Sequence, residues 1–164
     1  PYRNEIIAEL LELKPTIIRA NASEIMALAK ASNLPTKGVD STAESTEAIE
    51  AAKSLNKEFN ATVCISGETD IIIDKDQKLS LKNGDALMAK VTGLGCSASA
   101  ITAAFSAIIE NKFEATAAAM ALMGVCGQIA AKNSAGPGSL QLNLLDKLYN
   151  ISEEEFLSHL KISE

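Results

Sequence analysis

Residues 61–66 read Ala61-Thr62-Val63-Cys64-Ile65-Ser66, a nearly continuous apolar run that Gly67 ends. Runs of this kind are typical of strands that are buried on both faces of a parallel sheet. Residues 42–60 carry apolar side chains at helical spacing, which predicts a helix that leads into this strand. A helix followed by a buried strand favours an α/β fold with a mostly parallel central sheet.

Further elements are predicted on both sides of this strand. The β-branched run at residues 16–18 predicts a second buried strand, and residues 34–40, with Pro35 and Gly38, predict a loop. Because few central strands are present for such a sheet, we expect an N-terminal part of the domain to be missing from these 164 residues. The remaining predicted elements are helices at 2–13, 22–32, after Cys96 to about 111, 113–133, 140–149 and 152–160, and a hairpin of edge strands at 70–74 and 78–81. Ser152 and Glu155 predict a capping box at the start of the last helix.

The composition excludes several classes of protein. With 47% hydrophobic and 22% charged residues, the chain can bury a core, which argues against disorder. There are 15 Lys and Arg against 21 Asp and Glu, a net charge of −6 without a basic tract. We therefore expect no nucleic-acid partner, although backbone amides can still form a local pocket for a small phosphate.

Cysteine usage and the apolar stretches bear on cellular location. Cys64, Cys96 and Cys126 form no CxxC pair, so neither a disulfide framework nor a zinc site is indicated. A reducing, cytoplasmic location is the simple inference. Residues 115–131 border on membrane-spanning length but are rich in Ala and Gly. We interpret them as a buried helix and expect no membrane partner, with a membrane span as the minor alternative.

A glycine-rich turn precedes the helix predicted after Cys96. It reads Thr92-Gly93-Leu94-Gly95-Cys96-Ser97, and its two glycines permit a sharp turn and close approach of a ligand. Amides at the start of a helix point outward, where the helix dipole favours an anion. The pattern is neither a Walker A loop nor a dinucleotide-binding fingerprint. An ordinary tight turn and an anion site are equally compatible with this spacing.

Cys96 itself is a candidate base or nucleophile. A thiol at a helix N-terminus has its thiolate form stabilised. The alternative is a small buried hydrophobic residue, which is the common role of a free cysteine. Cys64 and Cys126 lie in apolar segments, so the buried role is preferred for both.

Polar residues near the ends of the two buried strands are further candidates. Arg19 could pair with a nucleotide phosphate, and Asn21 and Glu24, three residues apart, could both reach a magnesium ion or its waters. The local alternative for Asn21 and Glu24 is a helix capping box, which we prefer on local grounds. Ser66 ends a strand where ligands of α/β sheets collect. His159 is expected to be exposed and without a role.

Taken together, these segments resemble the C-terminal portion of the hydroxyethylthiazole kinase family, within the ribokinase-like superfamily. Residues 19–25 resemble the family's Asn-x-x-Glu region, and residues 92–97 match its anion-hole motif, with Cys where most ribokinase relatives have Asp. Residues 136–149 match its late loop and helix. The resemblance implies that residues 1–164 form the C-terminal portion of a single three-layer α/β/α domain.

The resemblance also implies a function. It is ATP-dependent phosphorylation of 4-methyl-5-(2-hydroxyethyl)thiazole in thiamine biosynthesis or salvage, by a homotrimer with sites shared between subunits. Carried over by position, Arg19 and Ser66 contact ATP, while Asn21 and Glu24 help hold Mg²⁺. The family's N-terminal segment, which supplies much of its thiazole pocket, has no counterpart in these residues.

The glycine turn takes its roles from the same resemblance. Gly93 lies against the thiazole substrate, the amides from Gly93 through Gly95 to Cys96 form the anion hole, and Cys96 occupies the place of the catalytic base. Three alternatives are a hydroxymethylpyrimidine kinase, a dehydratase of hydrated nicotinamide nucleotides, and a nucleotide-binding fragment without activity. The dehydratase has Asp after the second glycine, so Cys96 argues against it.

Overall fold

The computed structural model describes residues 2–34 and 44–163. The chain divides into two compact units, one of residues 1–67 and 71–78 and the other of residues 68–70 and 79–164. That the chain belongs to one single domain stays a prediction. The predicted loop after Leu34 and the predicted helix start at residue 42 lie outside the described residues.

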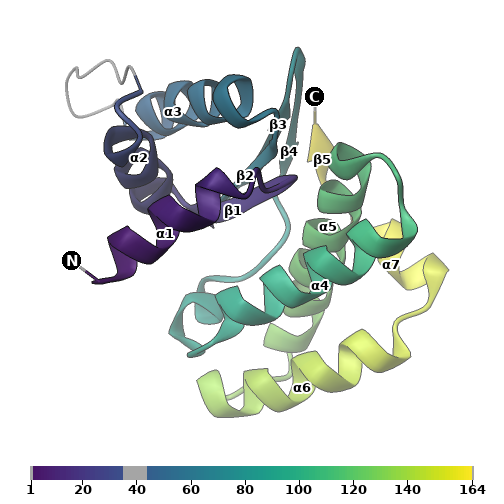
Figure 1. The fold of residues 1–164 in the computed structure, drawn as a ribbon. Coiled ribbons are helices and arrows are strands. Elements are labelled where there is room, and N and C mark those ends of the chain that lie inside the picture. Colours follow the sequence, from purple (N-terminus) through teal and green to yellow (C-terminus); the bar gives the residue numbers. More distant parts are fainter. Residues whose placement is uncertain (1, 35–43, 164) are drawn as a thin grey trace. The chain divides into compact units, whose positions relative to one another are not determined.

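The first unit packs helices against a pair of parallel strands (Figure 1). Helix α3 contacts both α2 and β2, and the shared core contains Ile25, Leu55 and Val63, all fully buried. Short alanines of α3 (Ala48, Ala51 and Ala52) allow this close packing, since they too are almost completely buried. Its elements are α1 (Tyr2–Glu12), β1 (Ile17–Asn21), α2 (Ala22–Ala31), α3 (Glu44–Phe59), β2 (Thr62–Ser66) and most of β3 (Asp70–Asp74).

Strands β1 and β2 run parallel, as the apolar runs predict. Their register pairs Ile18 with Val63 and Asn21 with Ser66. Strand β1 extends beyond the predicted residues 16–18 into polar Asn21. The extension has a tertiary cause, because each added residue pairs with a residue of β2. The carboxyl ends of the two strands therefore finish side by side.

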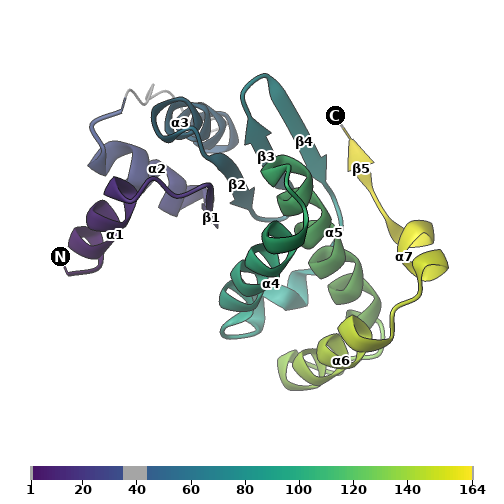
Figure 2. The ribbon, with the colours of Figure 1, turned by 45° about the vertical axis from the view of Figure 1, so that its right-hand side comes forward.

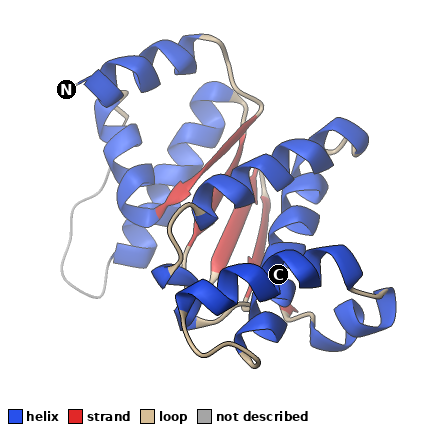
Figure 3. Cartoon of the chain, turned by 90° about the horizontal axis from the view of Figure 1, so that it is seen from below, coloured by secondary structure: helices blue, strands red, loops and turns tan. Residues whose placement is uncertain are grey.

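The sheet is mixed, with the strand order β1-β2-β3-β4-β5. Strand β3 pairs antiparallel with β2, and β4 (Gln77–Leu81) is its other neighbour, so the predicted hairpin is confirmed. That its strands are edge strands is wrong, because β3 lies between β2 and β4, and β4 lies between β3 and β5. Lys75 in the intervening turn has a φ of 51°, the left-handed conformation common in tight turns. The short β5 (Ile162–Ser163), which was not predicted, pairs antiparallel with β4. Figure 3 distinguishes these strands from the helices by colour.

The second unit is built around helix α5 (Figure 2). Thirteen of its 20 residues are buried, and it contacts α4, α6 and α7. This explains why the helix is apolar on nearly all sides. The unit also contains η1 (Ala86–Lys90), a 3₁₀ helix that was not predicted, together with α4 (Leu94–Ile108), α5 (Lys112–Ala131), α6 (Pro137–Asn150) and α7 (Glu153–His159).

Helix α5 is long and apolar enough to cross a membrane by length and composition. Two thirds of its most apolar window, 67%, is buried. The helix thus satisfies its apolar surface by packing on its neighbours, in agreement with the interpretation as a buried helix.

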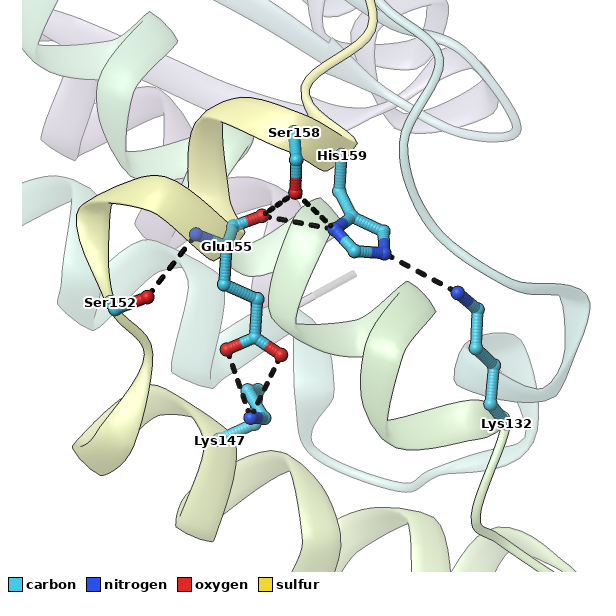
Figure 4. Close-up of polar contacts among 6 residues, drawn as sticks. All are labelled: Lys132, Lys147, Ser152, Glu155, Ser158 and His159. Carbon is cyan, nitrogen blue, oxygen red and sulfur yellow. Dashed lines mark hydrogen bonds and ion pairs between the residues drawn. The ribbon is translucent and has the colours of Figure 1, made fainter.

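The C-terminal helix α7 is tied to its neighbours by polar contacts (Figure 4). Ser152 caps α7, but the Glu155 carboxylate binds Lys147 of α6 at 3.1 Å instead of completing the predicted capping box. His159 was expected to be exposed, and this is wrong: it is half-buried. Its Nδ1 lies 2.9 Å from the Glu155 carbonyl oxygen and its Nε2 lies 3.4 Å from Lys132 Nζ. Long-range packing of α7 causes both differences.

Candidate active site

Two of the predicted nucleotide-binding residues meet at the carboxyl ends of β1 and β2. Arg19 Nη1 donates a hydrogen bond of 2.9 Å to Ser66 Oγ, which donates to the Ala20 carbonyl at 3.3 Å. Both Arg19 and Ser66 are half-buried. The parallel register places these side chains on adjacent strands, so residues 47 positions apart in sequence form one polar cluster. A guanidinium held in this way is pre-organised to bind a phosphate.

Asn21 and Glu24 form the capping box of α2, as their spacing predicts. Asn21 Oδ1 accepts from the Glu24 amide at 2.9 Å, and Glu24 Oε2 accepts from the Asn21 amide at 3.0 Å. The box fixes both side chains at an exposed helix start. Glu24 Oε1 takes no part in it. Capping and a metal-binding role are therefore compatible for this pair.

The side-chain oxygens of Asn21 and Glu24 suit a magnesium ion that takes most of its ligands from the substrate. Mg²⁺ commonly takes one or two carboxylates and completes its octahedron with waters and phosphates. Among the residues that the structure describes, no three His, Cys, Asp or Glu side chains gather as a metal centre. The Glu24 carboxylate, with the Asn21 amide oxygen beside it, fits coordination of Mg²⁺ by a single protein carboxylate. A metal at this place would depend on the nucleotide for most of its ligands.

The glycine turn of the second unit has the backbone that an anion site requires. Gly93 has a φ of +85°, a left-handed conformation, and caps α4 without a side-chain hydrogen bond. The amides of Leu94, Gly95 and Cys96 occupy the first turn, where a helix leaves its N–H groups without intrahelical acceptors. Gly93, Gly95 and Cys96 are all exposed. The turn is thus open to solvent, and the helix dipole favours a negative charge beside it.

Ser97 supports the turn in a way that sequence analysis missed. Its amide and its Oγ both donate to the Gly93 carbonyl, at 3.1 and 3.3 Å respectively. A serine hydroxyl bonding to the carbonyl four residues earlier is a common local pattern. The spacing of Gly93 and Ser97 in the sequence was the available signal for it.

The three cysteines differ in their surroundings. Cys96 is exposed, while Cys64 and Cys126 are buried, as the sequence predicts for the latter two. The alternative of a buried role for Cys96 is therefore excluded. Burial raises the pKa of the Cys126 thiol from 9.0 to about 11; Lys147 opposes this rise and Glu155 adds to it. Of the three thiols, only Cys96 is accessible to a substrate.

Thiol labelling should separate these environments. Reagents attack the thiolate, so a raised pKa leaves Cys126 protonated at pH 8 as well as shielded. Iodoacetamide at pH 8 should alkylate Cys96 in the native protein, and Cys64 and Cys126 only after a denaturant is added. Peptide mass spectrometry measures each site. Native labelling of Cys126 at the rate of Cys96 would contradict the packing of α5.

A cavity of about 560 Å³ lies elsewhere in the first unit. Its lining includes Leu11, Thr16 and Phe59, from the segments that precede β1 and β2. It is thus at the amino ends of these strands, whereas Asn21 and Ser66 mark their carboxyl ends. None of the predicted site residues lines this cavity.

The predicted site residues fall into two sets. Arg19, Asn21, Glu24 and Ser66 belong to the first unit, where Arg19 bonds Ser66 and the strand register pairs Asn21 with Ser66. The turn that contains Gly93, Gly95 and Cys96 belongs to the second unit.

Comparison with known proteins identifies the family. A model of the hydroxyethylthiazole kinase family matches residues 1–154. The chain belongs to the hydroxyethylthiazole kinase family. A hydroxyethylthiazole kinase of Syntrophus aciditrophicus is 50% identical over 162 residues, which are 98% of this chain and 60% of that protein. One from Arabidopsis thaliana is 43% identical over 163 residues, which are 99% of this chain and 59% of that protein.

A solved structure of the same family supports the fold. The hydroxyethylthiazole kinase of Pyrococcus horikoshii matches with a TM-score of 0.88 and 28% identity, over 99% of this chain and 59% of that one. The predicted α/β class and the family resemblance are thus confirmed. The chain spans about 60% of the length of these hydroxyethylthiazole kinase relatives.

Proposed function

We propose that the protein is a kinase that transfers the γ-phosphoryl group of ATP to the hydroxyl of 4-methyl-5-(2-hydroxyethyl)thiazole, a step of thiamine biosynthesis or salvage. The proposal rests on one observation above all. In a chain of the hydroxyethylthiazole kinase family, an exposed cysteine follows a left-handed glycine in the first turn of a helix. This arrangement offers amides for an anion and a thiol beside them.

The proposed step needs positioning and charge neutralisation more than covalent chemistry. The substrate oxygen attacks the γ-phosphorus as the bond from phosphorus to the bridging oxygen of ADP breaks. The amides of Leu94, Gly95 and Cys96 stabilise the equatorial oxygens of the transferring group, where negative charge is spread. Cys96, at the place of the base, accepts the alcohol proton, and because this transfer comes late in the step a weak base suffices. The products are the thiazole phosphate ester and ADP.

The first set of residues would bind the co-substrate. Arg19, held by Ser66 at 2.9 Å, carries a fixed positive charge for a nucleotide phosphate. Glu24 and Asn21 would help to hold Mg²⁺, which neutralises phosphate charge when it is bound. The capping box keeps both side chains in place before the ligand arrives.

Three parts of the proposal rest on the family resemblance alone. They are the contact of Gly93 with the thiazole, a homotrimer, and the sharing of sites between its subunits, whereas a cytoplasmic location is inferred from the cysteine usage. The second candidate function is phosphorylation of hydroxymethylpyrimidine, because cysteine at the place of Cys96 also suits that chemistry. No nucleic-acid or membrane partner forms part of either candidate.

A direct assay distinguishes the two candidates. The intact protein is incubated with Mg²⁺ and γ-labelled ATP, together with the thiazole alcohol or with hydroxymethylpyrimidine. We expect label in the thiazole product, with kcat/KM at least about tenfold above that for the pyrimidine. Preferential labelling of the pyrimidine would support the second candidate, and label in neither product would refute both.

A further inference from the structure

The segment that leads from β4 to the glycine turn, residues 82–92, is anchored on helix α5. We call it the approach segment. It ends directly before Gly93, so its placement determines where the turn begins. Asp85 caps η1 within it, with Oδ1 accepting from the Leu87 amide at 2.8 Å, and Val91 is buried near its end. Two contacts with α5 distinguish it from an ordinary surface loop.

The first anchor is Asn83, which is only 6% exposed and lies in a network of hydrogen bonds. Its Nδ2 donates to the His159 carbonyl at 2.7 Å and to Gln128 Oε1 at 3.1 Å. Its Oδ1 accepts from the Lys161 amide at 2.7 Å. A buried amide satisfied on both sides holds one position firmly.

Gly124 of α5 makes room for this anchor. A Cβ added there would lie 2.9 Å from Asn83 Cβ and 3.0 Å from the Asn83 carbonyl oxygen. Because backbone is involved, rotation of a side chain cannot relieve the overlap. Glycine at this position therefore lets the approach segment lie directly against the helix.

The second anchor is Met88 of η1, one turn of α5 further along. A Cβ added at Gly127 would overlap the Met88 Sδ and Cε atoms. The thioether therefore fills the space that the missing side chain leaves. The Val91 amide also donates to the Met88 carbonyl at 3.1 Å, which connects this anchor to the residues just before Gly93.

We propose that Asn83 and Met88, seated on Gly124 and Gly127, are positioning residues that set the place of the glycine turn and hence of its anion-binding amides. As a statement about phosphoryl transfer, this rests on the proposed function. The anchoring of the turn itself does not depend on the proposed function. Anchoring the approach segment in two places restricts the turn to one position before substrate arrives.

A compensating pair of variants tests the proposal. Gly127→Ala should displace Met88 and lower kcat about tenfold, with a smaller change in the KM for ATP. It should also change the alkylation rate of Cys96 at least about threefold, since that thiol reports on the turn. Adding Met88→Ala to Gly127→Ala vacates the space for the new methyl group and should restore both values to within about twofold of the wild type.

Controls separate this role from general destabilisation. All assays use the intact protein, well below the unfolding midpoint of each variant. Gly138→Ala adds a methyl group in open space and should leave Cys96 labelling unchanged. If Gly127→Ala fails to fold, Met88→Ala alone leaves the space beside Gly127 unfilled and should raise the labelling rate about threefold, whereas in the double variant the methyl group added at position 127 fills that space. Unchanged labelling in the folded variants, or no rescue in the double variant, overturns the proposal. A wild type without kinase activity refutes only the proposed function, because labelling still reports on the turn.

Discussion

Cys96→Ala should lower kcat by about 10²–10³-fold, while the dissociation constant for ATP changes less than about threefold. The thiol is exposed on the first turn of α4, where it can take the proton of a substrate hydroxyl. The amides proposed to bind the anion belong to the backbone and remain in the variant. Transfer should therefore become slow while the nucleotide still binds. Single-turnover kinetics and calorimetric ATP titration measure the two quantities separately.

Cys96→Asp is the matched control for this base. Aspartate occupies the equivalent place in most ribokinase relatives, and a carboxylate can accept a proton at the same helix position. We expect it to keep at least about a tenth of the wild-type kcat. A Cys96→Ala variant as active as the wild type would remove the base assignment. Equal losses in both variants would indicate that the thiol acts in another way.

Glu24→Gln should raise the Mg²⁺ concentration for half-maximal activity about tenfold. The amide oxygen of glutamine can still accept from the Asn21 amide, so the capping box of α2 is retained. What is lost is the negative charge of the proposed metal ligand. Titration of activity with Mg²⁺ at saturating ATP measures the shift, and thermal unfolding shows that the helix is intact.

Asn21→Asp provides the control from the other side of the box. An aspartate also caps the helix and adds an oxygen ligand, so we expect the Mg²⁺ requirement to stay within about threefold of the wild type. An unchanged Mg²⁺ titration for Glu24→Gln would refute its metal role. A large fall in thermal stability for Glu24→Gln would assign the glutamate to capping instead.

Local pattern predicted most of the fold. The apolar run at 61–66 forms β2, whose residues from Thr62 to Ile65 are all buried. The sequence predicted this because a continuously apolar strand has no face that favours water. Helix α3 and the hairpin also lie close to their predicted bounds. Strand β5 was missed because its two residues, Ile162 and Ser163, acquire strand character only by pairing with β4.

The ends of the helices depend both on neighbouring residues in the sequence and on contacts between helices. Helix α4 ends at Ile108, before the predicted end near 111, because Asn111 instead caps the next helix. Helix α6 begins at Pro137, three residues before the predicted start, since proline is favoured at the first helical position. Glu155 left its expected capping bond for Lys147, a partner that only the packing of α6 with α7 supplies.

The candidate site likewise combines contacts between sequence neighbours, which the sequence predicts, with long-range contacts, which it does not. The capping box of Asn21 and Glu24, and the turn before Cys96, use neighbours within four residues, so sequence spacing was sufficient. The Arg19 bond to Ser66 spans 47 positions and became visible only through the parallel register. The hydrogen bonds of Asn83 with His159 and Lys161 span even more of the sequence, 76 and 78 positions. No short motif encodes such contacts.

In the proposed mechanism, the amides of the glycine turn bind the terminal phosphate of the nucleotide. The most direct measurement is a crystal structure of the intact protein with Mg²⁺ and a non-hydrolysable ATP analogue. We predict γ-phosphate oxygens within about 3.2 Å of the Gly95 and Cys96 amide nitrogens. A fully occupied nucleotide whose terminal phosphate lies away from these nitrogens would contradict an anion-binding role of the glycine turn.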